Sequence, residues 1–193
     1  LSPEPGAHRF VWDLHHATPP ALSHSYPIAA IYRDTPREPV GPWALPGTYR
    51  VRLTAGGQTV EQSLTVRMDP RVTTPPAAWA QMFALSIRVV EAMRADSALL
   101  AEVQELRRAS SAAAPGAAAP AAALPAPSGA QGVADSLAAI ERDLRRLNGQ
   151  FSGLLGLIED ADAAPTTQAV RAAGELERAV AAARERVRAA AGR

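Results

Sequence analysis

Four histidines and one aspartate lie close together in the first part of the sequence and could bind a metal ion. They are His8, Asp13, His15, His16 and His24. Imidazole is a common metal ligand, so the composition of this segment permits a metal site. His15 and His16 are adjacent, however, and adjacent residues of a strand point to opposite faces. We therefore interpret these histidines as loop or strand-edge residues and predict no metal site.

Three acidic residues near the end of the chain, Glu159, Asp160 and Asp162, are the second candidates for chemistry. Paired carboxylates can act as general acid and base. These carboxylates follow a helical segment in a turn, where short acidic residues commonly cap the next helix. The sequence contains no cysteine, no phosphate-binding loop, no nucleophile elbow and no HExxH motif. We therefore expect a structural role here, and we predict no catalytic residue and no cofactor.

Four residues are candidate contacts for a partner: Tyr32, Trp43, Arg50 and Arg52. Trp43 lies in a proline-rich loop, and an exposed tryptophan can contact a protein or a sugar. Together with Tyr32 it permits a carbohydrate-binding module as one alternative. Packing of Trp43 beneath the loop is the competing interpretation.

The composition excludes some classes of function. The chain has 193 residues and a net charge of +1, and its 20 basic residues are all arginine. A nucleic-acid surface needs a concentrated basic field, so we expect no nucleic-acid partner. No run of about 18 apolar residues suits a transmembrane helix, and the first six residues lack the features of a signal peptide. Because the chain begins with Leu1, we expect a fragment or a processed product.

Residues 8–68 carry the signals of β-structure. Phe10, Trp12 and Leu14 alternate with more polar residues, which is the period of a half-buried strand. The strongest signal is a hairpin around residues 55–58, where glycines join two alternating segments. The strands that we predict are residues 8–14, 28–32, 48–54 and 59–66.

Residues 74–191 have the pattern of helices. Apolar residues at three- and four-residue steps predict a first helix from Thr74 to about Arg108, a second through Leu137–Ile158 and a third through Val170–Val187. The last two helices, separated by a short break, should form an antiparallel pair that packs with the first. Residues 109–131 are rich in Ala, Pro, Gly and Ser and indicate a mobile linker.

We therefore predict an α+β chain: a partial Ig-like or fibronectin-like antiparallel β-sandwich followed by an antiparallel three-helix bundle. The predicted parts are the β-module (1–72), the first long helix (73–108), the linker (109–131) and a helical hairpin (132–193).

Three motifs in the β-region, in order, carry a family resemblance. They are Arg9–Leu14 (RFVWDL), Gly41–Thr54 (GPWALPGTYRVRLT) and Gln62–Val72 (QSLTVRMDPRV). A fourth motif runs from Leu147–Gln150 to residues 160–166. With these motifs the chain resembles the C-terminal region of bacterial secreted β-propeller proteins of the sortilin or Asp-box (BNR-repeat) type. Those proteins are often labelled glycosyl hydrolases or likened to a photosystem assembly factor.

The resemblance implies that the chain follows a propeller and that its location is extracytoplasmic, either periplasmic or secreted. Any glycosidase chemistry would belong to the propeller, and no active-site residue of the family maps onto this sequence. An Ig-like sandwich has about seven strands, whereas we predict at most four. Either another chain completes the sheet or an edge stays open, and an open edge can accept an added strand.

We therefore expect a non-catalytic accessory module that docks or stabilises a larger protein or complex. Its expected partner is the upstream propeller or a multisubunit complex, with membrane association only through that partner. Three alternatives stay open: the C-terminal part of a glycoside hydrolase, a carbohydrate-binding module, or a structural subunit of a membrane complex, such as a photosynthetic one.

Overall fold

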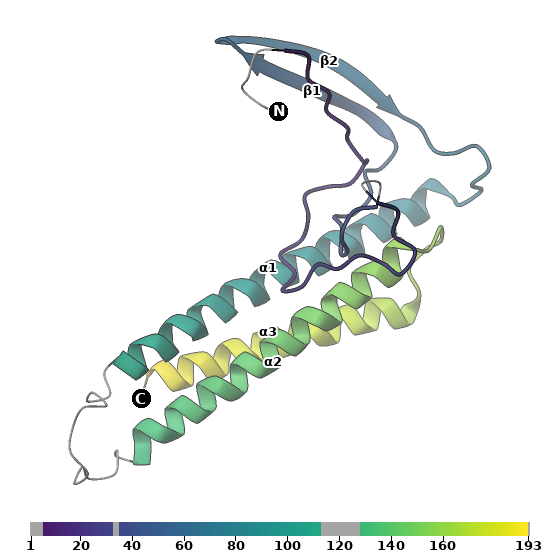
Figure 1. Ribbon diagram of the computed structural model, residues 1–193. Coiled ribbons are helices and arrows are strands. Elements are labelled where there is room, and N and C mark those ends of the chain that lie inside the picture. Colours follow the sequence, from purple (N-terminus) through teal and green to yellow (C-terminus); the bar gives the residue numbers. More distant parts are fainter. Residues whose placement is uncertain (1–5, 33–34, 113–127, 193) are drawn as a thin grey trace.

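The computed structural model describes residues 6–32, 35–112 and 128–192. It shows an α+β chain in which one two-stranded antiparallel sheet precedes three helices. The elements are β1 (Gly47–Ala55), β2 (Gln58–Val66), α1 (Pro76–Ala112), α2 (Ser128–Glu159) and α3 (Thr167–Ala191). Figure 1 shows the helices side by side, running alternately in opposite directions, with the hairpin apart from them and above α1.

Local signals in the sequence set the ends of the helices. Pro76 is the first residue of α1, a position where a missing N–H costs little. Thr166 caps α3, because its hydroxyl accepts a hydrogen bond from the Ala169 N–H at 3.1 Å. We expected the neighbouring acidic residues to provide this cap, and that expectation was wrong. None of the helices in the described part of the chain is both long and apolar enough to cross a membrane.

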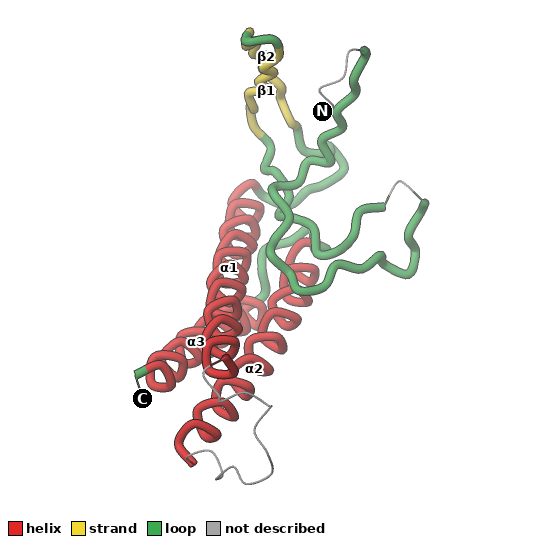
Figure 2. Tube along the Cα trace, turned by 60° about the vertical axis from the view of Figure 1, so that its left-hand side comes forward, coloured by secondary structure: helices red, strands yellow, loops and turns green. Residues whose placement is uncertain are grey.

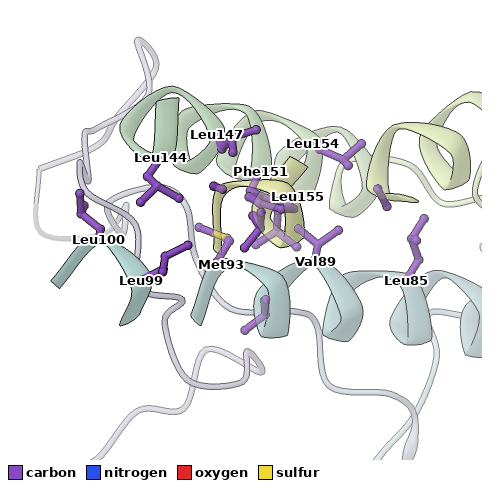
Figure 3. Close-up of a cluster of buried hydrophobic side chains, with 14 of the residues drawn as sticks. Leu85, Val89, Met93, Leu99, Leu100, Leu144, Leu147, Phe151, Leu154 and Leu155 are labelled. Carbon is purple, nitrogen blue, oxygen red and sulfur yellow. The ribbon is translucent and has the colours of Figure 1, made fainter. Parts of the chain in front are cut away.

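One core joins the three helices. Figure 3 shows Val89 and Met93 of α1 reaching toward Phe151 and Leu155 of α2, and all four side chains are almost completely buried. The third helix contributes smaller residues, such as Ala173, which allow a close approach of the helix axes. These helices are confirmed, and most of the apolar positions that predicted them lie in the core, although Val170 is 45% exposed.

Ion pairs link the helices at the margins of this core. Arg88 of α1 lies 2.9 Å from Glu177 of α3, and Arg186 of α3 lies 2.7 Å from Asp143 of α2. The Arg186 hydrogen bond holds the pKa of the Asp143 carboxyl below its usual value. The ion pairs are partly exposed, so each contributes at most about 1 kcal/mol and mainly favours one register of the helices.

The described residues between Asp13 and Ala44 fold as an irregular layer against α1 and α2, from their ends near the hairpin to their middle. It is held by isolated antiparallel bridges, His15 with Trp43 and Ser25 with Glu38. Gly41 is required in this layer, because a Cβ there would lie 2.1 Å from the His16 carbonyl oxygen.

Two of the predicted strands are wrong. Residues 8–14 pair with no other strand among the described residues, and Phe10 is 73% exposed. The segment ends in a turn, because the Asp13 carboxylate accepts the His15 N–H at 3.0 Å and Leu14 has φ 63°. Residues 28–32 also form a turn, in which Ala30 N–H bonds to the Pro27 carbonyl.

The hairpin prediction is confirmed, with both strands as expected to within one residue. The β-structure in the described residues consists of this one sheet and the isolated bridges. Of the predicted sandwich, the structure therefore shows two paired strands. The predicted linker, 109–131, was too wide, because α1 continues to Ala112 and α2 begins at Ser128. Residues 113–127 of that linker lie outside the described residues.

Candidate docking surface

A tight turn sets the register of the hairpin. Gly56 has φ 56° and Gly57 has φ 76°, and a two-residue turn with positive φ at both positions is of type I′. Its twist matches that of the strands on either side. Ala55 therefore pairs with Gln58, and the register continues through Val51 with Gln62 to Gly47 with Val66.

One face of the hairpin is apolar and open to solvent. Directly opposed residues of an antiparallel pair share a face, so the register places Tyr49, Val51 and Leu53 of β1 beside Val60 and Leu64 of β2. Val51 is 50% exposed, Leu53 47%, Val60 62% and Leu64 40%. Figure 2 shows why: the hairpin stands away from the helices, and the N-terminal segment does not join its strands.

The opposite face is polar and almost neutral. Arg50 and Arg52, two of the residues predicted to contact a partner, share the carboxylate of Glu61 at 3.5 and 2.7 Å. Beyond them the hydroxyls of Thr54 and Thr59 lie 2.9 Å apart. These polar side chains therefore pair with one another within the hairpin.

Tyr49 anchors the base of the hairpin to the rest of the chain. Its ring packs edge-on against Trp12 with 5.1 Å between ring centroids, and its hydroxyl donates to the Leu45 carbonyl at 2.5 Å. Trp12 in turn donates from its ring N–H to the His15 carbonyl at 2.9 Å. Trp12 is half-buried and packs against Tyr49 at one end of the apolar face.

The other two predicted contact residues lie away from the hairpin face. Trp43 is 41% exposed, and its ring lies against that of His15 with 3.8 Å between centroids. Its backbone N–H donates to Glu159 Oε2 at 2.9 Å, which fixes the loop to the end of α2. Tyr32 is 84% exposed.

The histidine-rich segment lines a shallow hollow of about 450 Å³ whose walls include Asp13, His15, His16, His24 and Arg37. His15 Nδ1 lies 3.6 Å from an Asp13 oxygen, while the His16 ring packs toward Phe83. Within the residues that the structure describes, no three His, Asp or Glu side chains form a group that could hold a metal ion. Three of these histidines do lie at one hollow, although His15 and His16 make different contacts.

Of the acidic residues considered for catalysis, Glu159 has a structural task. One carboxylate oxygen accepts the Trp43 N–H, and the other accepts the hydroxyl of Ser86, which is buried in α1. It therefore ties the loop layer to two helices. Asp160 and Asp162, which lie close to Glu159 in the sequence, are both exposed, and no pattern in the sequence predicted the contacts of Glu159.

A buried polar cluster holds the loop against the helices on the other side. Asn148 of α2 accepts the Leu22 N–H at 2.8 Å and donates to the Pro20 carbonyl at 3.3 Å. It also donates to Asp96 of α1 at 3.2 Å. Asp96 is completely buried, and this burial raises the pKa of its carboxyl to about 6.

The open apolar face of the hairpin, defined by Tyr49, Val51, Leu53, Val60 and Leu64, is thus the feature of the described residues that fits docking. Comparison of the chain with known protein families, with curated proteins and with solved structures found no match.

Proposed function

We propose that this chain is a non-catalytic accessory module whose hairpin docks onto a larger protein. The observation that carries the proposal is the exposure of the apolar face, where four aliphatic side chains on adjacent strands are each 40–62% exposed. A two-stranded hairpin is marginally stable in water and normally needs further strands or another layer. Apolar side chains gathered on one such surface are typical of an interaction site.

The occupant that fits this face is a second β-sheet. The side chains follow the two-residue period of a strand, and two sheets pack face to face about 10 Å apart with alternating side chains between them. We propose that the partner supplies the missing layer of an Ig-like sandwich, next to the antiparallel three-helix bundle. The resemblance of residues 9–14, 41–54 and 62–72 to the region after a secreted propeller supports this arrangement and an extracytoplasmic location.

The contacts of the residues considered for chemistry support a non-catalytic role. Glu159 hydrogen-bonds to the loop layer and to Ser86, and His15 stacks on Trp43. Both side chains are thus engaged in holding the loop layer together. Tyr49 contacts Leu45 and Trp12, which directly flank this layer, so the layer positions the hairpin relative to the helices.

Two neighbouring positions of β1 test the proposal. Leu53 lies on the apolar face and Thr54 on the polar face, and both are exposed. The tagged chain would be used to capture proteins from native membrane and soluble fractions, and Leu53→Gln would be compared with Thr54→Gln. Leu53→Gln should weaken binding of the captured partner by roughly fivefold or more, since full burial of a leucine contributes about 1.5–3 kcal/mol and about half of this side chain is still exposed in the free chain.

Thr54→Gln should bind the same partner as the wild-type chain does. Circular dichroism of both variants would check that the helices are intact. Equal capture by both variants, or equal loss in both, would show that the apolar face is not the docking surface.

A further inference from the structure

The backbone of the hairpin has two open edges. The type I′ turn makes Ala55 and Gln58 a hydrogen-bonded pair, and such pairs then alternate along the ladder with pairs whose N–H and C=O groups point outward. Among the described residues, no main-chain hydrogen bond joins either strand to a segment outside the hairpin. The outward-pointing residues are Thr48, Arg50, Arg52 and Thr54 on β1, and Thr59, Glu61, Ser63 and Thr65 on β2.

The two edges differ in charge. The outward residues of β1 include two arginines, which are 62–70% exposed in their side chains. Those of β2 include one charged residue, Glu61, whose carboxylate is already paired with both arginines. Charged side chains on an edge strand discourage the addition of another strand. The β2 edge is therefore the one suited to pairing.

The sequence of β2 is nearly symmetric about its centre. Gln62 is the midpoint of Gln58–Val66, and an antiparallel copy centred there would set Val60 against Leu64 of the other copy. Thr59 would oppose Thr65, and Glu61 would oppose Ser63. These last two pairs join outward-pointing groups with outward-pointing groups, so the register also satisfies the backbone hydrogen bonds.

The same operation on β1 gives a different result. Its midpoint is Val51, and an antiparallel copy centred there would place Arg50 opposite Arg52 of the other copy twice. Like charges directly opposite each other destabilise a strand pair. Self-pairing is thus selective for β2.

We propose that two copies of this chain associate through antiparallel pairing of their β2 edges. The result is a four-stranded sheet in the order β1-β2-β2-β1, in which the two apolar faces lie on the same side and meet at the pair of Gln62 residues. This goes beyond the proposed function, because it uses the edge of the hairpin, and it doubles the face that a larger partner would cover. The test is made on the purified chain alone, so its failure would leave face docking untouched.

A single introduced cysteine tests the register directly, because the natural chain contains none. In the proposed dimer Gln62 faces its copy in a pair without hydrogen bonds, with Cα atoms about 4.5 Å apart, and a disulfide can bridge that distance. We expect Gln62→Cys to form a disulfide-linked dimer under mild oxidation, seen on non-reducing gels.

The matched control is Val51→Cys. Val51 lies directly opposite Gln62 on the same face and is 50% exposed, but its copy would lie three strand spacings away, roughly 14 Å. We expect it to stay monomeric on the gel. Equal crosslinking of both variants, or none in Gln62→Cys, would overturn the proposal.

Charge changes at the same position test whether the occupant is a second copy. Gln62→Lys and Gln62→Glu should each weaken the dimer, by roughly fivefold from like charges at the axis. A mixture of the two should restore it as a heterodimer. Sedimentation of the wild-type chain as a monomer throughout a concentration series, or no difference between the separate and mixed variants, would contradict the pairing.

Discussion

The hairpin and the three helices bury their apolar residues to opposite extents. Phe151 and Leu144 in α2 are completely buried, whereas Val60 and Val51 in the hairpin are 62% and 50% exposed. Both regions have the apolar period expected of their secondary structure. Three helices can enclose a common core, but two strands present a face that the described part of the chain covers only at Tyr49, where Trp12 packs. The helices therefore explain how the chain folds, and the hairpin is the part through which we propose that it binds a partner.

Truncating one apolar residue in each region tests whether the helices and the hairpin contribute differently to stability. Phe151→Ala should destabilise the chain by about 3–5 kcal/mol, because it removes buried contacts and leaves a cavity. Val51→Ala should cost less than about 1 kcal/mol, since half of that side chain is already in water. Chemical denaturation followed by helical circular dichroism measures both. Similar losses would mean that the isolated chain already uses the hairpin face for its stability.

The buried carboxyl of Asp96 makes the stability of the helical region depend on pH. Its pKa is about 6 in the folded chain against 3.8 in the unfolded chain. Because the folded pKa is the higher, the stability that the protonated form contributes is complete below about pH 4. It is lost as the pH rises through 6, and the total is roughly 3 kcal/mol.

Asp96→Asn should remove this part of the pH dependence, so the variant should gain stability relative to wild type between pH 4 and pH 8. Unfolding free energies across that range measure the gain. A constant difference between the two proteins would show that Asp96 does not titrate in this range.

The loop layer comes next in expected effect. Asn148→Ala leaves the Leu22 N–H without its partner in α2, while the Pro20 carbonyl keeps the hydrogen bond from the Ser97 hydroxyl of α1. We expect a loss of about 1–3 kcal/mol. Hydrogen exchange at the Leu22 amide should also become faster. The matched control is Gln150→Ala on the exposed side of α2, which should leave both quantities unchanged.

The polar face of the hairpin should give the smallest effect. Glu61→Gln removes the ion pairs to Arg50 and Arg52, which are exposed and screened by salt, so the change should be below about 1 kcal/mol. Denaturation at low and high salt measures it. A larger loss, independent of salt, would mean that this face is more enclosed than its exposure indicates.

The sequence predicted the helices well, because their apolar residues repeat over many turns and enclose one another. It also predicted the hairpin, since two glycines and two alternating segments specify it locally. The same alternation misled at Phe10, Trp12 and Leu14. There the Asx turn at Asp13 and the positive φ of Leu14 end the extended segment, and no neighbouring strand pairs with it.

The links between distant parts of the chain could not be predicted. Asn148 binds Leu22, and Glu159 binds Trp43, across more than 100 residues in each case. No local pattern predicts such a contact, because a polar side chain in a helix and a backbone N–H in a loop carry no signal of each other in the sequence. The partner contacts predicted at Tyr32, Trp43, Arg50 and Arg52 stay predictions.

Photo-crosslinking from the two faces of β1 tests the central claim most directly. A photoreactive residue would replace Val51 on the apolar face or Arg50 on the polar face, and the chain would be irradiated in native extract. We expect the photoreactive residue at position 51 to crosslink to a larger protein and the one at position 50 not to do so. Crosslinks of equal yield from both positions, or from Arg50 alone, would contradict docking through the apolar face of the hairpin.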